Sequence, residues 1–138
     1  MAAVVYRYRL PYVVEDAQSF PGLNLALRNP ADPSRFAYAQ AVVDSGAEYS
    51  LFDGQIASAI GLDLLAGKRF GFETISGSPI ESRIHPVILV HGELGEFKLD
   101  LRFSTGTIAR NILGRDFFNL AQIGFRERQS LLMITPEP

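Results

Sequence analysis

Alternation of apolar and polar residues is the feature that most restricts what this chain can fold into. In FKLDLRF, one face of an extended strand carries apolar side chains and the other carries charged ones; the apolar residues are Phe97, Leu99, Leu101 and Phe103. The preceding segment IHPVILV is separated from it by residues 91–95, which include two glycines. We therefore predict a β-hairpin at residues 84–103.

Other segments support a mainly β fold. GLNLALR and FAYAQAVV alternate in the same way, residues 131–134 form a short apolar strand, and the N-terminal VVYRYRLPYVV is predicted as a strand in which Pro11 favours a sheet edge. Two short helices are expected, one in FDGQIASAIGLDL before Gly61 and one from Asp116 to a stop at Gly124. Many short strands with little helix indicate a small closed or sandwich-like β domain spanning residues 1–138.

Composition excludes several functional classes. A chain of 138 residues with 47% hydrophobic residues is long enough for one buried core. The formal net charge of -2 gives no basic footprint for nucleic acid or an anionic membrane. Cysteine is absent, Arg7 and Arg9 interrupt the N-terminal apolar run, and no apolar segment reaches membrane-spanning length. A cytoplasmic protein is expected.

The segment AVVDSGAEYSLF carries the first candidate for chemistry. Its apolar strand ends on Asp44, and the chain then turns through Ser45 and Gly46. A carboxylate at the end of a buried strand is partly desolvated, and a tight turn would display it on a rigid support. Taken alone, Asp-Ser-Gly is also an ordinary turn, so a purely structural role is the competing interpretation.

A second segment changes this balance. NILGRDFF runs from the apolar pair Ile112 and Leu113 into Gly114, Arg115 and Asp116. Together with AVVDSGA it resembles the retropepsins, the retroviral-type aspartic proteases and their cellular and bacterial relatives. The resemblance covers residues 36–134 and implies a mainly β, retropepsin-like (acid protease) closed barrel with one or two short helices.

The resemblance implies an aspartic endopeptidase. Hydrolysis by carboxylates needs two of them facing one water, and this chain contains one Asp-Ser/Thr-Gly. The second is expected to be Asp44 of another copy in a homodimer, with Ser45 tying the two active-site turns together and Gly46 admitting the substrate backbone. No metal or organic cofactor is implied, and the substrate is a peptide or protein.

Further residues carry roles implied by the resemblance. A flap is expected in GFETISGSPIES, with arms around Phe72 and Ile80; the flap and substrate-binding residues would be Ala47, Ile75, Ser76, Gly77, Ser78, Arg110 and Ile112. Without the family, the same segment is an ordinary exposed hairpin, and Arg110 either selects an acidic substrate residue or points to solvent. Glu48 and Arg115 would form a structural salt bridge beneath the site.

Several alternatives stay open. The same fold could serve as a catalytically silent dimeric peptide-binding or assembly module, or the partner could be a different protein. His85 and His91 are the two histidines, and without cysteine they predict no zinc site. The strand at residues 131–134 either pairs across the dimer axis, as in relatives, or lies within the barrel of its own chain, where its truncation would unfold the protein.

Overall fold

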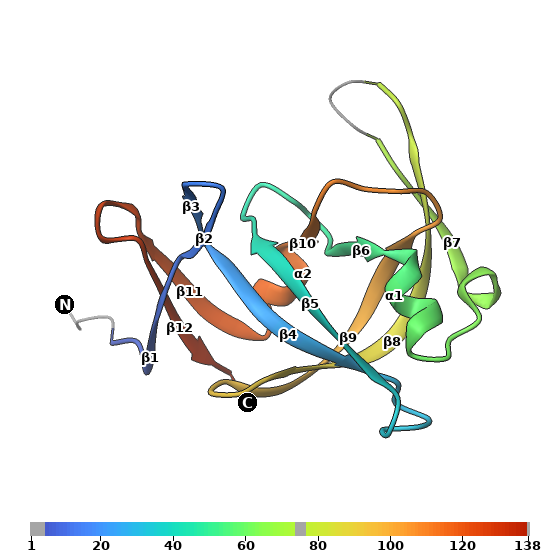
Figure 1. The fold of residues 1–138 in the computed structure, drawn as a ribbon, viewed down its shortest axis with the longest axis horizontal. Helices are drawn as coiled ribbons and strands as arrows, with labels where there is room; N and C mark the ends of the chain where they lie inside the picture. The colour runs from blue at the N-terminus through green and yellow to red at the C-terminus, as the bar shows by residue number, and fades with distance from the viewer. Residues whose placement is uncertain (1–4, 74–76, 138) are drawn as a thin grey trace.

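The computed structural model describes residues 5–73 and 77–137, and six strands of this part close into a barrel (Figure 1). The order around the barrel is β4-β5-β10-β6-β9-β8, and pairing of β4 with β8 closes the ring. The strands are β4 (Gly22–Arg28), β5 (Phe36–Val43), β6 (Leu51–Asp53), β8 (Ile80–His91), β9 (Gly95–Ser104) and β10 (Asn111–Leu113). The predicted mainly β closed barrel is confirmed.

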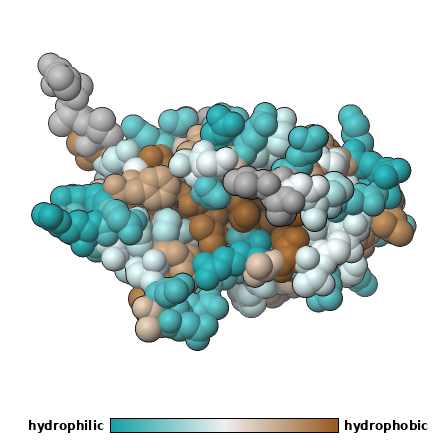
Figure 2. Space-filling model, turned by 90° about the horizontal axis from the view of Figure 1, so that it is seen from above, coloured by the Kyte–Doolittle hydropathy of each residue, from teal (hydrophilic) through white to brown (hydrophobic). Residues whose placement is uncertain are grey.

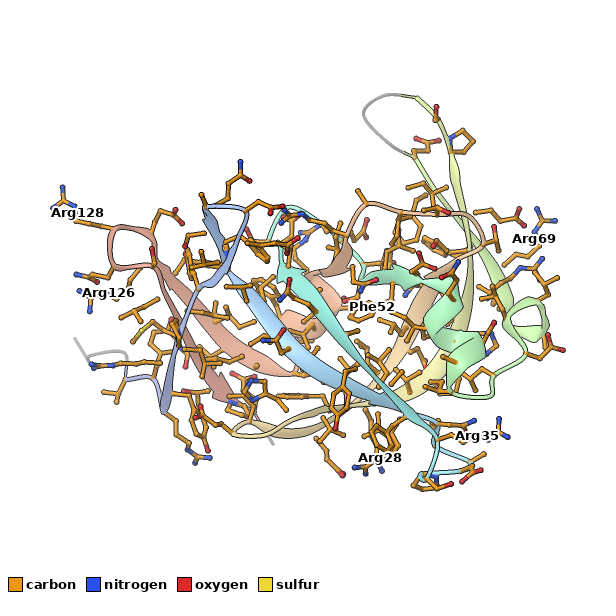
Figure 3. The ribbon with its side chains drawn as sticks, viewed as in Figure 1. Arg28, Arg35, Phe52, Arg69, Arg126 and Arg128 are labelled. Carbon is orange, nitrogen blue, oxygen red and sulfur yellow. The ribbon has the colours of Figure 1, made fainter. Side chains whose placement is uncertain are left out.

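The barrel interior is filled by the apolar face that the alternation predicts. Phe97, Leu101 and Phe103 of β9 are buried, while Leu99 is partly buried against the same core. β8 and β9 pair antiparallel over ten positions, so the predicted hairpin is confirmed. Phe52 is fully buried and points inward in Figure 3, whereas Arg126 and Arg128 point outward at one end. Side-chain burial on one face thus sets the register of these strands.

Helices are short, and one differs from the prediction. α1 (Gly54–Ala59) is capped by Asp53, whose Oδ1 accepts from the Gln55 N–H at 2.9 Å, and Gly61 lies beyond its end with φ +82°. α2 (Arg115–Phe118) has four residues and does not reach Gly124. Gly124 instead lies within strand β11 (Ala121–Arg126), because residues 121–126 pair antiparallel with residues 131–136. Two 3-10 turns, η1 (Leu64–Ala66) and η2 (Glu127–Gln129), complete the helical segments.

The chain termini form a separate three-stranded sheet. β12 (Leu131–Pro136) lies between β1 (Tyr8–Pro11) and β11 and pairs antiparallel with both. Both edges of the C-terminal strand are therefore occupied by its own chain, in a sheet separate from the barrel, so residues 131–134 do not lie within the barrel as the second alternative had it. Leu132 and Ile134 are fully buried, so this strand belongs to the core. Pro11 lies on an edge strand, as predicted.

The N-terminal strand is broken where the prediction has it continuous. After β1, Tyr12 is buried, and the chain resumes as β2 (Val13–Glu15), which forms a two-stranded hairpin with β3 (Gln18–Phe20). The break arises because Tyr12 bonds to the η2 turn: its N–H donates to the Ser130 carbonyl at 2.8 Å and its hydroxyl donates to Glu127 Oε1 at 3.0 Å. Among the described helices, none is long and apolar enough to cross a membrane.

Candidate active site

Asp44 is placed by two parallel strands at the centre of the barrel sheet. β5 and β10 run parallel, with Val43 opposite Leu113, and both of these residues are buried. The Asp44 N–H donates to the Leu113 carbonyl at 2.9 Å, which continues the ladder for one more residue. The Asp44 side chain is partly exposed. The Asp44 carboxylate thus lies where a buried pair of strands ends, on a backbone segment that the sheet holds rigidly.

The turn after Asp44 fixes one oxygen of its carboxylate. The Gly46 N–H donates to Asp44 Oδ1 at 2.8 Å, and the Ala47 N–H donates to the Asp44 carbonyl at 3.3 Å. An added Cβ on Gly46 would approach Asp44 Oδ1 to 3.1 Å, so glycine is favoured here. Ser45 and Gly46 are exposed. This geometry supplies the tight turn that the sequence predicts and orients the carboxylate in it.

The segment at residues 114–116 packs directly against this turn. The Arg115 N–H donates to the Ala47 carbonyl at 2.8 Å, and the Gly114 N–H donates to Ser50 Oγ at 2.9 Å. A Cβ on Gly114 would lie 2.7 Å from the Tyr49 carbonyl carbon and 2.8 Å from the Ala47 oxygen, so this position requires glycine. The two motifs, distant in sequence, are therefore one structural unit.

Ser50 and Asp116 hold this unit together, although the sequence pattern predicts only a helix start at Asp116 and no role for Ser50. Ser50 is fully buried, and its N–H and Oγ donate to Asp116 Oδ1 at 2.9 and 2.6 Å. The Phe117 N–H donates to the same oxygen at 2.9 Å. In the sequence, a serine between an aromatic residue and an apolar pair gives little indication that it has a structural role. Its burial depends on the contact with residues 114–116, which the local sequence does not show. These bonds fix the floor of the site.

The salt bridge expected between Glu48 and Arg115 is not formed. Both residues lie in the described part of the chain, both are exposed, and none of the ion pairs found there joins them. Exposed charges gain little by pairing, since water solvates each of them well. The backbone of Arg115, rather than its guanidinium, makes the contact with the Asp44 turn.

A hairpin stands beside this turn, as the sequence predicts. β7 (Lys68–Phe72) pairs with the first half of β8, and Phe72 lies opposite Ile80, the two residues expected in its arms. Gly77 and Ser78 are exposed, and Gly77 has φ +82°, a conformation that favours glycine. Ile75 and Ser76 lie outside the described residues. In Figure 1 the hairpin projects from the same end of the molecule as the loop after β5.

A groove of about 400 Å³ separates the Asp44 loop from β7. Residues 46–49 line one side and residues 70–73 the other. Figure 2 views this end of the molecule, where hydrophobic residues gather near the middle of the face. The groove can receive an extended segment of chain between the loop and the hairpin.

Arg102 of β9 joins the two walls of this groove. Its guanidinium carbon lies 3.7 Å from the centre of the Tyr49 ring and 4.3 Å from that of Phe70. The Tyr49 and Phe70 rings meet edge to face at 5.1 Å, and Phe70 meets Phe72 at 5.0 Å. Arg102 Nε is buried without a hydrogen-bond partner in the described part of the chain. The base of the hairpin is thus attached to the Asp44 loop by cation–π and ring contacts.

On the other side of Asp44, Arg110 is exposed to solvent and also contacts an aromatic ring. Its guanidinium carbon lies 4.5 Å from the centre of the Phe20 ring, and both residues line a groove of about 230 Å³ that includes Val42. Ile112 is half-buried in β10, opposite Val42 of β5 and Leu51 of β6. The candidate pocket residues therefore flank the strand that carries Asp44.

The two histidines have structural partners. His85 is buried, and its Nε2 lies 2.9 Å from the Leu64 carbonyl. His91 Nδ1 accepts from the Glu93 and Leu94 N–H groups in the β8–β9 turn, and burial holds the pKa of His91 below its ordinary value. Across the described residues, no group of three or more potential metal ligands is found.

Comparison with solved structures identifies a retropepsin-like fold. The chain is similar to a retropepsin-like aspartic protease from Rickettsia conorii, at 20% identity and a TM-score of 0.65, over 93% of this chain and 98% of that one. It is also similar to the EIAV protease in complex with the inhibitor HBY-793, at 18% identity and a TM-score of 0.54, over 78% and 92% of the respective chains. The sequence matches no protein-family model and no curated protein. The expected retropepsin-like fold is confirmed, and the first similarity extends beyond residues 36–134.

Proposed function

We propose that this chain is an aspartic endopeptidase that acts as a homodimer. A water held between the Asp44 carboxylates of the two copies attacks the carbonyl carbon of a peptide bond. The observation that carries the proposal is the position of Asp44, on a turn locked to residues 114–116 within a fold shared with two aspartic proteases. Carboxylates in protein chains are common, but this one lies on a rigid turn, two residues before the start of the groove lining at Gly46.

The chemistry needs the two carboxylates in different protonation states. Like charges about 3 Å apart do not both ionise, so the pair shares one proton. The ionised carboxylate takes a proton from the water, while the protonated one donates to the carbonyl oxygen of the substrate. The Gly46 N–H holds Oδ1 of each Asp44, and Ser45 of each copy steadies the paired turns. This reaction proceeds without a metal or organic cofactor.

The substrate is an extended peptide lying in the groove between the Asp44 loop and β7. Gly46 and Ala47 give its backbone close access, and Ile112 forms part of the wall of a side-chain pocket. The β7–β8 hairpin acts as a flap that closes over the peptide and excludes water, with Gly77 and Ser78 near its tip. Arg110 favours an acidic substrate residue at the groove that it lines with Phe20.

A catalytically silent peptide-binding or assembly module is the second candidate. The hairpin favours this alternative, since Gly77 is the single glycine between Phe72 and Ile80, and Pro79 stiffens one arm. A hairpin that closes poorly would bind a peptide without excluding water from it. The fold and the dimer would be the same in both candidates, so cleavage of peptides distinguishes them.

The test is cleavage of a diverse peptide library by the wild type and by Asp44→Asn, at high protein concentration and from pH 4 to 7. We expect defined cuts by the wild type, sensitivity to a pepstatin-type inhibitor and loss of at least a hundredfold in rate in Asp44→Asn, a size typical for a residue in acid–base catalysis. Activity should fall toward neutral pH as the shared proton is lost.

Asp100→Asn is the matched control. Asp100 is exposed on β9, so the substitution makes the same change of charge as Asp44→Asn but away from the groove. Its activity should equal that of the wild type. A folded, dimeric wild type that cuts no peptide in the library would reject the endopeptidase and favour the binding module.

A further inference from the structure

The groove between the Asp44 loop and β7 combines aromatic rings with acidic groups. Its lining is formed by residues 46–49 and 70–73 of a single chain. Three lining residues are aromatic, three are small, two are acidic and none is basic; they are Gly46, Ala47, Glu48, Tyr49, Phe70, Gly71, Phe72 and Glu73. The proposed function places a peptide in this groove, and on that premise the lining indicates which side chain of the peptide binds there.

The two acidic groups belong to opposite walls and have no counter-charge of their own. Glu48 lies in the Asp44 loop, and Glu73 directly follows β7. Both side chains are exposed, and neither belongs to an ion pair within the part of the chain that the structure describes. A cation that entered the groove would therefore lie near two unpaired carboxylates, one on each side.

Other grooves of the described structure carry charges that are already balanced. In the groove over β4 and β5, Arg28 pairs with Glu96 at 2.8 Å. On the side of the β7–β8 hairpin that faces away from the loop after β5, Arg69 pairs with Glu81 at 3.0 Å (Figure 3). The groove beside Arg110 contains acidic residues as well, so both signs of charge are present there. Unpaired charge of one sign on facing walls distinguishes the groove beside Asp44 from these three.

The aromatic rings of the groove already bind one guanidinium group. Tyr49, Phe70 and Phe72 meet edge to face, with ring centres 5.0 to 6.5 Å apart. The guanidinium carbon of Arg102 lies 3.7 Å from the centre of the Tyr49 ring and 4.3 Å from that of Phe70. All three rings line the groove and Arg102 does not, so a second cation can reach them from the groove. The charge of Arg102 opposes such a cation, but the two carboxylates outweigh it.

We propose that this groove selects peptides that carry an arginine or a lysine close to the cleaved bond. The apolar stem of such a side chain packs on Phe70 and Phe72, while its charged head lies between Glu48 and Glu73. Arginine is preferred over lysine, because its planar guanidinium stacks on rings and binds carboxylates through two hydrogen bonds. The groove begins two residues after Asp44, and an extended peptide advances about 3.3 Å per residue, so the basic residue lies within about three positions of the bond.

An apolar side chain is the competing ligand for the rings. It would cover Phe70 and Phe72 equally well, but it would take water from Glu48 and Glu73 without replacing it by another partner. An acidic side chain would be repelled by both carboxylates. The test therefore compares arginine, leucine and glutamate at the same position of a peptide.

Binding is measured by fluorescence anisotropy with the full chain carrying Asp44→Asn, which leaves the peptides intact. The probes are labelled decapeptide pools with arginine, leucine or glutamate at the fifth position and neutral residues elsewhere. The arginine pool should bind at least tenfold more tightly than the leucine pool, which corresponds to about 1.4 kcal/mol, and the glutamate pool should bind most weakly. Raising the ionic strength should reduce the preference for arginine, because the carboxylates are exposed.

Substitution of both carboxylates assigns this preference to them. Glu48→Gln combined with Glu73→Gln should make the arginine and leucine pools bind equally, and Glu48→Lys combined with Glu73→Lys should reverse the order in favour of glutamate. The matched control combines Glu93→Gln with Glu137→Gln. Both control residues are exposed, and Figure 1 shows the β8–β9 turn and the C-terminus at the opposite end of the molecule from the loop after β5. The control should keep the full preference for arginine.

Cleavage of the same pools by the wild type gives a second measurement. The ratio of kcat/KM for the arginine pool to that for the leucine pool should be at least ten, with cuts within about three residues of the arginine. The ratio should fall to about one in the variant that combines Glu48→Gln with Glu73→Gln. A ratio compares two substrates of one enzyme, so a general loss of activity would leave it unchanged.

Failure of this selection is distinguishable from failure of the endopeptidase. Cleavage of the arginine and leucine pools at equal rates would overturn the selection and leave the endopeptidase in place. A preference in binding that depends on Glu48 and Glu73, without any cleavage, would support the selection and reject the endopeptidase. A preference that persists after both glutamine substitutions, or a chain that binds none of the pools, would overturn the selection.

Discussion

The loop that carries Asp44 and the β7–β8 hairpin line the same groove, but different forces hold them. The loop is fixed by backbone hydrogen bonds to Leu113 and Arg115 and by the buried Ser50. β7 pairs with β8 alone among the described strands, and its contact with the loop consists of aromatic rings and Arg102. The side that positions the carboxylate is thus built into the core.

The two regions therefore differ in rigidity: the loop keeps Asp44 in a fixed position, whereas the hairpin can move. Buried hydrogen-bonded backbone opens only at a free-energy cost close to that of global unfolding, whereas a half-exposed hairpin held by side chains opens at a smaller cost. A peptidase needs both properties, a fixed carboxylate and a cover that lets the peptide in. Three substitutions test whether the two regions differ in this way.

Gly114→Ala should have the largest effect, because it acts on the fixed side. The new Cβ would meet backbone atoms of Ala47 and Tyr49, which cannot move aside without shifting the Asp44 turn. We expect a loss of about 3 kcal/mol in the free energy of unfolding, the upper end of the range for overpacking. Urea denaturation measures this loss.

Gly92→Ala is the control, since a Cβ there meets nothing within 4 Å. It should change the free energy of unfolding by less than about 0.5 kcal/mol, as surface substitutions usually do. Equal stability of the two variants would mean that the Asp44 turn is not locked by the close approach at Gly114.

Ser50→Ala should have the next largest effect. It removes the acceptor for the Gly114 N–H and one donor to Asp116 Oδ1, and both partners stay buried or partly buried. We expect a loss of about 2 kcal/mol in the free energy of unfolding, because a buried polar group is left without its partner. Ser58→Ala, on the exposed side of α1, serves as the control in the same urea titration. If Ser50→Ala lowered the free energy of unfolding no more than the control does, Ser50 would not be what holds the two motifs together.

Arg102→Met should have the smallest effect on stability and a local effect on dynamics. Methionine keeps an apolar stem between Tyr49 and Phe70 but lacks the guanidinium, so we expect a loss of about 1 kcal/mol. Amide hydrogen exchange should become faster in β7 while the Asp44 N–H stays protected.

Lys98→Met, exposed on β9, should leave exchange in both regions unchanged. If Arg102→Met instead accelerated exchange of the Asp44 N–H as much as exchange in β7, the two regions would open together. The proposed difference between a fixed loop and a movable hairpin would then be wrong.

Much of the barrel could be predicted because its strands are local patterns. The β8–β9 hairpin and β4, β5 and α1 follow from alternation, turn residues and the glycine at position 61 that limits the helix. The terminal sheet could not be predicted as well. Ala121, Ile123 and Phe125 do alternate in β11, but Gly124 in their midst was interpreted as a helix stop. The Tyr6 ring lies close to this glycine, a contact between the two ends of the chain that no local pattern shows.

The sequence by itself determined the class of fold and the turn that carries Asp44, because strand periodicity and an Asp-Ser-Gly turn act over a few residues. Only the tertiary structure decided which side chains fasten that turn, that Glu48 and Arg115 do not pair, and that β12 lies between β1 and β11. Those outcomes depend on burial and on partners far along the chain. A hydroxyl or a charge has the same local pattern whether it is buried against a distant segment or exposed to water.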